Sequence, residues 1–150
     1  MKKSTRIQTL VELNARQESS ALTSMGLTQQ KLQDAQAQIE HLKNYRREYQ
    51  QKYMQLLSAG TKMGELLEFR SFIEKLDKAI LGQEQALIGI EQEAAEKTKH
   101  WQTLHHKTDS LQKICTQAKQ AELKHEDKRE QSAQDERTSR SFRSHLAQRF

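Results

Sequence analysis

The sequence predicts an all-α protein, folded as a two-helix antiparallel coiled-coil hairpin whose C-terminal helix is longer than its N-terminal one. Three observations support this prediction. The chain of 150 residues contains no proline, five helix-favouring residue types (Ala, Glu, Lys, Leu and Arg) supply 70 residues, and apolar residues recur at heptad spacing on both sides of a glycine-containing segment. This composition, combined with a period of about 3.5, is typical of coiled coils.

The first helix is predicted from a stripe that begins at Ile7. Steps of four and three residues taken alternately from Ile7 meet an apolar or aromatic residue at eleven of fifteen positions. An unbroken heptad phase of this length predicts a coiled-coil helix. The positions are Ile7, Val11, Asn14, Glu18, Ala21, Met25, Thr28, Leu32, Ala35, Ile39, Leu42, Arg46, Tyr49, Tyr53 and Leu56.

The chain is expected to reverse direction at residues 58–64. The heptad phase breaks between Leu56 and Leu66, and this interval contains Gly60 and Gly64. Glycine adopts the left-handed conformation that ends a helix without the steric penalty of a Cβ atom. The segment "SAGTKMG" is therefore predicted to be the tip of a helical hairpin.

The second helix is predicted from a stripe that begins at Leu66, apolar or aromatic at thirteen of seventeen positions. Antiparallel pairing about the tip makes the numbers of facing residues sum to about 122, so Ile7 is expected near Cys115. The positions are Leu66, Phe69, Ile73, Leu76, Ile80, Gln83, Leu87, Ile90, Ala94, Lys97, Trp101, Leu104, Thr108, Leu111, Cys115, Ala118 and Glu122.

The remainder of the chain has no partner in this pairing. We expect a hairpin over residues 1–123 and a charged helical extension or tail over residues 124–150. Within the extension, only Phe142, Leu146 and Phe150 recur at the i, i+4 spacing of a helix.

Composition and motifs argue against several classes of protein. A single cysteine excludes an internal disulfide, and no apolar run or leader-like segment predicts a membrane span or export signal, so a cytoplasmic protein is expected. The net charge of +5 comes from basic residues interleaved with acidic ones, which gives a weak footprint for nucleic-acid binding.

No catalytic, cofactor or metal site is predicted. The chain has no glycine-rich phosphate loop, no CxxC motif and no paired nucleophile and base. His100, His105 and His106 are spaced i, i+5 and i+6, so they point in different directions on a helix and do not match metal-ligand spacing. Cys115 is interpreted as a small buried apolar residue in the seam.

Aromatic residues gather within about three helical turns of the tip. Tyr45, Tyr49 and Tyr53 precede it, while Phe69 and Phe72 follow it, with Phe72 on the edge of the seam. Two interpretations stay open from the residues alone: the aromatics thicken a short coiled coil, or they form a surface for a partner.

The segments "YRREYQQKY" and "EFRSFIEKLDKAI", on either side of the turn, resemble the flagellar type III export protein FliJ family. The resemblance implies a coiled coil similar to the central stalk of rotary ATPases, which stimulates the hexameric export ATPase and couples it to the cytoplasmic part of the export gate membrane protein. The family pattern has a histidine where this chain has Gln83, so Gln83 is not carried over. The gate-contact residues that the resemblance implies are Gln38, Leu42, Tyr45, Tyr49, Phe72, Leu76 and Ala79.

The resemblance also implies that the ATPase binds the end of the coiled coil that bears both termini. The protein is then expected to associate peripherally with the inner membrane at the export apparatus. The resemblance also admits export chaperones as further partners. We expect the isolated chain to be a monomer. The alternatives are a stalk protein of a virulence type III secretion system, a dimerising coiled-coil scaffold and a basic nucleic-acid-binding protein. The residues expected to meet the ATPase are Arg137, Arg140, Phe142, Arg143, Leu146, Arg149 and Phe150.

Overall fold

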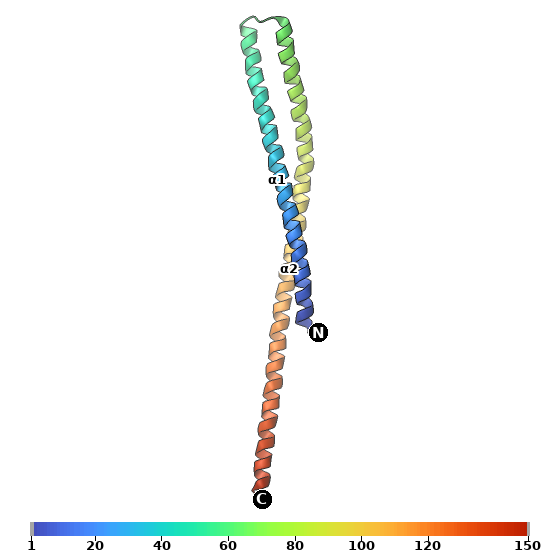
Figure 1. The fold of residues 1–150 in the computed structure, drawn as a ribbon, viewed down its shortest axis with the longest axis vertical. Coiled ribbons are helices and arrows are strands. Elements are labelled where there is room, and N and C mark those ends of the chain that lie inside the picture. The colour runs from blue at the N-terminus through green and yellow to red at the C-terminus, as the bar shows by residue number, and fades with distance from the viewer. Residues whose placement is uncertain (1, 150) are drawn as a thin grey trace. The chain divides into compact units, whose positions relative to one another are not determined.

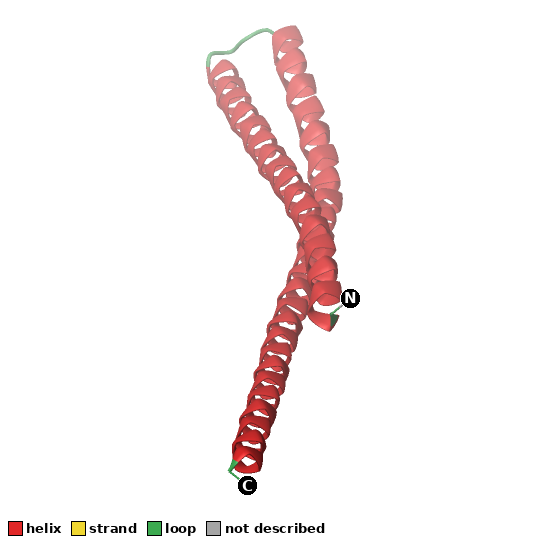
Figure 2. Ribbon diagram, turned by 60° about the horizontal axis from the view of Figure 1, so that its bottom comes forward, coloured by secondary structure: helices red, strands yellow, loops and turns green. Residues whose placement is uncertain are grey.

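The computed structural model describes residues 2–149 and contains two helices in this range. Helix α1 spans Lys3–Ser58 and helix α2 spans Met63–Gln148, 56 and 86 residues respectively. The two helices are antiparallel and joined by one short turn (Figure 1). No strand is present in the described range (Figure 2). The predicted fold class, an all-α hairpin with a longer second helix, is confirmed.

The turn is a Schellman motif centred on Gly60. Gly60 has φ +69°, and it is the only residue of the described range with a positive φ. The Thr61 N–H donates to the Leu56 carbonyl at 3.2 Å, and the Gly60 N–H donates to the Leu57 carbonyl at 3.4 Å. These two bonds satisfy carbonyls at the C-terminus of α1 that would otherwise lack helical partners.

The start of α2 differs from the expectation in one detail. Gly64 belongs to α2 and does not form part of the turn, because the Lys62 carbonyl already accepts the first helical bond, from the Leu66 N–H at 3.3 Å. Glu65 lies in the first turn of α2, where a negative charge interacts favourably with the helix dipole. One glycine is therefore enough to end α1.

The chain forms two compact units, each built from a part of both helices. Unit 1 comprises residues 1–17 and 104–150, and unit 2 comprises residues 18–103. None of the predicted seam positions is exposed in either unit, and the most buried include Val11, Ile39 and Ile80. The expected division of the chain at residues 123 and 124 stays a prediction.

Within unit 2, the size of the seam residues varies along the helices. Ala21 and Ala94 are buried at the end away from the turn, whereas Tyr49, Tyr53 and Phe69 occupy the seam near the turn. The two helices of unit 2 lie further apart near the turn (Figures 1 and 2). The larger side chains account for this separation, because helix spacing follows the volume of the contacting residues.

Ion pairs on the edges of unit 2 confirm the antiparallel register. Lys31 pairs with Glu93 at 3.4 Å and Lys43 pairs with Glu84 at 3.3 Å. All four side chains are substantially exposed, so each pair contributes about 1 kcal/mol or less to stability. Their main structural value is that each pair identifies one flank of the seam.

Unit 1 has a small apolar core and one buried polar layer. Ile7, Val11 and Cys115 form the core. One helical turn further along α1, buried Asn14 donates from Nδ2 to the Leu104 carbonyl at 3.3 Å and to Thr108 Oγ1 at 3.0 Å. A shifted pairing would leave this amide without partners, so the polar layer favours a single register.

The N-terminus of α1 is held by a carboxylate from α2. Glu122 accepts the Ser4 N–H at 3.1 Å and the Ser4 hydroxyl at 2.6 Å. These hydrogen bonds lower the pKa of Glu122 below its ordinary value of 4.5. Glu122 therefore acts as an N-cap supplied by the opposite helix, since it satisfies a free N–H and complements the helix dipole. Beside it, the hydrogen bond from Lys2 to Glu126 at 2.9 Å raises the pKa of Lys2.

Beyond this contact α2 continues as a single helix in unit 1. Every residue from 123 to 149 is exposed, and the helix ends at Gln148. An exposed pair, Arg140 with Glu136 at 3.8 Å, gives it weak i, i+4 support. In residues 2–149, neither helix is long and apolar enough to cross a membrane.

We predict that Ile80→Asp destabilises unit 2 by about 3 kcal/mol, because it buries an unpaired charge. Ile80 is 3% exposed in the seam. The neighbouring residue Leu81 is 57% exposed, so Leu81→Asp is the matched control and is expected to change stability by less than about 0.5 kcal/mol. Thermal melts followed by circular dichroism measure both. Equal melting temperatures for the two variants would contradict the seam.

We also predict a pH-dependent effect of Glu122→Gln. Because folding lowers the pKa of Glu122, its contribution to stability is complete above pH 4.5 and is lost as the pH falls from there through the lowered value. The melting temperature of the variant should be below that of the wild type at pH 7, and the difference should shrink on acidification. Glu130→Gln, at an exposed position of α2, is the control. A difference that stayed constant with pH would exclude an ionised Glu122 as its cause.

Candidate partner-binding surface

Four aromatic rings meet near the turn of unit 2, around Tyr49. The Tyr49 ring centroid lies 4.5 Å from Phe72, 5.8 Å from Phe69 and 5.7 Å from Tyr45, which stacks on it with planes 20° apart. Lys52 Nζ lies 5.3 Å from the centroid of the Tyr49 ring, within the range of a cation–π contact. Offset and tilted pairs at these distances are favourable, so the cluster holds its rings in defined positions.

The heptad repeat shows which flank of unit 2 this cluster occupies. Tyr45 follows Lys31 by two heptads and Phe72 precedes Glu93 by three, so both lie on the flank marked by the Lys31–Glu93 pair. Gln38 and Ala79 occupy the same two heptad positions. We call the surface formed by Gln38, Tyr45, Phe72 and Ala79 the aromatic flank.

The seven residues that the resemblance implies for the gate divide into exposed and less exposed positions. The four residues of the aromatic flank are exposed, with Tyr45 at 47% and Phe72 at 38%. The other three belong to the seam beneath them: Leu42 and Tyr49 are half-buried, while Leu76 is buried. The surface thus consists of exposed side chains that rest on seam residues, a more ordered arrangement than four separate surface residues.

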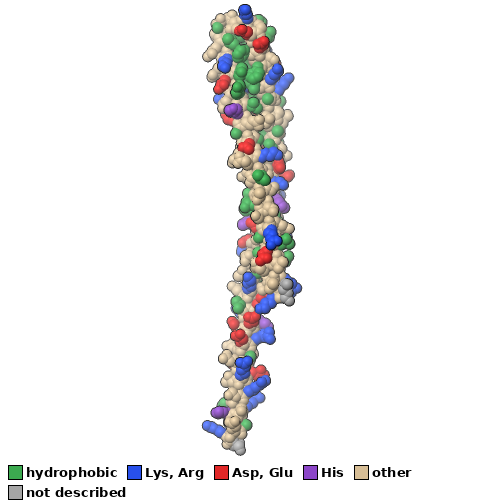
Figure 3. All heavy atoms as spheres, in the orientation of Figure 1, with side chains coloured by type: hydrophobic (Ala, Val, Ile, Leu, Met, Phe, Trp, Pro, Cys, Tyr) green, Lys and Arg blue, Asp and Glu red, His purple; other side chains and the backbone are tan. Residues whose placement is uncertain are grey.

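Hydrophobic side chains gather at this end of unit 2 on the face seen in Figure 3. Large exposed aromatics are enriched where proteins bind partners, because they bury much area at a small cost in conformational entropy. The aromatic residues divide between the two interpretations, since some lie in the seam and others are exposed beside it. Phe69 and Tyr49 fill the seam, and Tyr45 and Phe72 extend beyond it.

Sequence reasoning did not single out a second exposed apolar group at the same tip. Met54, Leu57, Met63 and Leu67 are between 46% and 72% exposed. In the sequence they are neighbours of the seam positions, and the heptad repeat identifies only the seam residues. Looking for apolar residues one step off the heptad phase would have found them.

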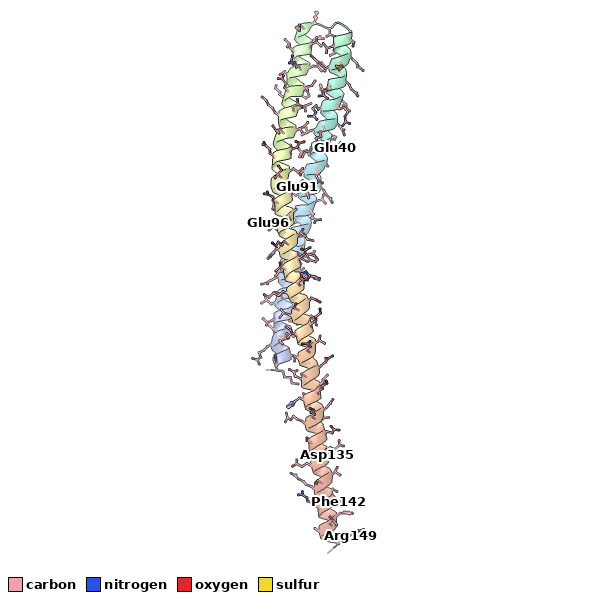
Figure 4. The ribbon with its side chains drawn as sticks, turned by 180° about the vertical axis from the view of Figure 1, so that it is seen from behind. Glu40, Glu91, Glu96, Asp135, Phe142 and Arg149 are labelled. Atoms are coloured by element: carbon pink, nitrogen blue, oxygen red, sulfur yellow. The ribbon has the colours of Figure 1, made fainter. Side chains whose placement is uncertain are left out.

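The residues predicted for the ATPase lie on the unaccompanied part of α2 in unit 1. All those within the described range are exposed. Phe142 projects from α2 where no other helix lies beside it, and Arg149 follows the end of the helix (Figure 4). Phe150 lies outside the described residues. At about 100° per residue, Phe142 and Leu146 share one side of α2, whereas Arg137 and Arg140 point to the opposite side. The helical part of the extension therefore offers one apolar side and one basic side.

His105 and His106 are neighbours on α2. The rings of His105 and His106 lie 6.0 Å apart, and residues 2–149 contain no group of three or more His, Cys, Asp or Glu side chains that could hold a metal ion. Cys115 is fully buried, and its Sγ donates to the Gln8 side-chain oxygen at 3.3 Å. Burial and this contact fit the structural role expected for Cys115 and make it a poor nucleophile.

Comparison with known proteins gives one match. The family model described as "Flagellar FliJ protein" matches residues 2–147, which is nearly the whole chain. No curated protein and no solved structure matches the chain.

Proposed function

The chain belongs to the FliJ family of coiled-coil proteins associated with flagellar type III export, and we propose that it binds both the export ATPase and the export gate. In this proposal the aromatic flank of unit 2 contacts the cytoplasmic part of the gate, and the α2 extension of unit 1 contacts the hexameric ATPase. The protein itself has no catalytic role. Its association with the inner membrane is peripheral and results from these two partners.

The observation that carries the proposal is the aromatic flank. Its exposed residues are those that the family resemblance assigns to the gate, and ring contacts with Tyr49 at 4.5 Å and 5.7 Å fix the positions of Phe72 and Tyr45. Preorganised aromatic side chains are effective anchors because little further ordering is required when a partner binds. Leu76 and Tyr49 support this surface from the seam beneath it.

The extension supports the ATPase contact through its charge and exposure. No acidic residue follows Glu136, whereas Arg137, Arg140, Arg143 and Arg149 do. Phe142 is 66% exposed among them. Guanidinium groups bind carboxylates strongly once water is excluded, so a partner surface with acidic groups around an apolar hollow would fit this helix.

The two proposed surfaces differ in construction. The aromatic flank is formed by α1 and α2 together and rests on the seam between them, whereas the extension consists of α2 alone. The proposed partners and the stimulation of the ATPase rest on the family and on the chemistry of these surfaces.

We predict that the double change Tyr45→Ala and Phe72→Ala weakens binding to the cytoplasmic part of the gate. The expected loss is about 2 kcal/mol or more, roughly thirtyfold in Kd, because aromatic anchors dominate interface energies. The loss of stability should stay below the ~3–5 kcal/mol of a buried Phe→Ala change, since both rings are partly exposed. Titration of the purified gate domain and a thermal melt measure the two effects.

The matched control for this experiment is Met54→Ala with Leu67→Ala, which removes exposed apolar area from the same tip but on the other flank. This variant should bind the gate as the wild type does. If both double variants lost binding equally, the gate would be recognising general apolar character and not the aromatic flank.

We predict that removal of residues 132–150 abolishes stimulation of the export ATPase while leaving the helices paired. The deletion keeps both the Lys2–Glu126 pair and the Glu122–Ser4 contact, so the melting temperature should change little. ATP hydrolysis with purified components measures the stimulation. Asp135→Asn with Glu136→Gln, which removes only the acidic groups of the segment, is the control and should stimulate fully. Full stimulation by the truncated chain would place the contact on the paired helices.

A further inference from the structure

The tip of unit 2 has a second exposed apolar surface, on the flank opposite the aromatic one. Leu57 follows Lys43 by two heptads and Met63 precedes Glu84 by three, so both lie on the flank marked by the Lys43–Glu84 pair. Met54 and Leu67 lie one helical turn from them on the same side. We call the surface formed by Met54, Leu57, Met63 and Leu67 the methionine flank.

We propose that the methionine flank is a docking site for an amphipathic helix of a partner protein that carries acidic residues beside its apolar anchors. Its residues differ from those of the surface proposed for the gate, and the two surfaces border each other on α2, where Leu67 and Phe72 line one shallow hollow. The two sites share the tip, but their residues occupy different heptad positions, and they differ in side-chain chemistry.

The arrangement of the four side chains fits a helix. Met54 and Leu57 form one short row on α1, and Met63 and Leu67 form a second on α2. Two adjacent rows of this kind accept the i, i+3 and i+4 anchors of an amphipathic helix between them. Methionine side chains are flexible and polarisable, so they adapt to the shape of an incoming apolar face.

Charge selects the kind of helix. Arg47 lies one heptad before Met54, Lys62 lies in the turn beside Met63, and Arg70 lies one turn after Leu67. Two carboxylates lie beside the site as well: Glu74 lies 3.8 Å from Arg70, and Glu68 lines a shallow hollow of α2 together with Leu67. Glu65 occupies the heptad position of Phe72 and so lies on the aromatic flank. Three cations against two anions leave the surroundings of the site net positive, which favours acidic flanking residues on the partner.

The same features exclude a second copy of the chain as a stable occupant. An identical tip would bring its own cations against these three. Four partly exposed side chains also provide far less than the ~800 Å² per partner that a stable interface needs. The occupant is therefore a partner bound reversibly.

The test uses two synthetic helical peptides of about 20 residues, long enough for more than five turns. They share leucines at the same i, i+3, i+4 and i+7 positions, but the flanking residues are Glu in one and Lys in the other. Fluorescence anisotropy with the full-length protein measures binding. We expect the Glu peptide to bind at least about tenfold more tightly than the Lys peptide, and its Kd to rise about tenfold or more in Met54→Ser with Leu67→Ser.

Two controls keep the result specific. Leu27→Ser changes a residue of α1 that is 70% exposed and far along the helix from the tip, and Tyr45→Ala with Phe72→Ala changes the aromatic flank. Both should bind the Glu peptide as the wild type does. Circular dichroism confirms that each variant folds, and Met63→Ser provides a second test should the double variant unfold.

Three outcomes would overturn the proposal. Equal binding of the Glu and Lys peptides would remove the role of charge, and loss of binding only in the aromatic-flank variant would assign the peptide to the other surface. Dimerisation in sedimentation, or flotation with phosphatidylglycerol vesicles, that was lost in Met54→Ser with Leu67→Ser would identify a second copy or a lipid surface as the occupant. Because the gate domain is absent from these measurements, they are independent of the proposed function.

Discussion

The narrow apolar seam between two antiparallel helices is the constraint on which the rest of the structure depends. Neither helix has a wide apolar face, so each can bury its stripe only against the other, and the order of both follows from their pairing. Where the helices are paired, the side chains available for binding lie outside the seam, because the seam residues are buried or half-buried. The aromatic and methionine flanks are both of this kind. Stability and recognition consequently involve adjacent but different residues.

The heptad pattern was sufficient to predict the fold and a set of seam positions of which none is exposed. Even polar interruptions such as Asn14 and Glu122 occupy the seam. The pattern could not predict which groups form hydrogen bonds with these polar side chains. The Asn14 bonds to Leu104 and Thr108, and the Glu122 bonds to Ser4, depend on the axial position of one helix against the other at the level of single atoms. Heptad spacing defines that position only to within about one turn.

The candidate site was predictable in part. The resemblance supplied the seven residues expected at the gate. Their division into exposed and buried members required coordinates. Phe72 and Leu76, for example, are only one helical turn apart on α2, yet the first is exposed and the second is buried. The methionine flank escaped sequence reasoning for a related reason. Met63 and Leu67 lie off the heptad phase, next to the seam residues at the start of the second helix, and the structure shows them to be exposed while Leu66 and Phe69 are half-buried.

The position of the single turn also determines the order in which the hairpin can form. Paired residues next to the turn are close in sequence, as Tyr49 and Phe72 are, whereas Ser4 and Glu122 are separated by 118 residues. Closing a short loop loses less chain entropy than closing a long one, so contacts beside Gly60 form first, and each contact shortens the loop that the next must close. The pairing therefore extends from the turn toward the termini, and fraying proceeds in the reverse direction. The Ser4–Glu122 contact is then the last to close and the first to open, so that, of α1, the N-terminal end is the part most readily exposed to hydrogen exchange and proteases.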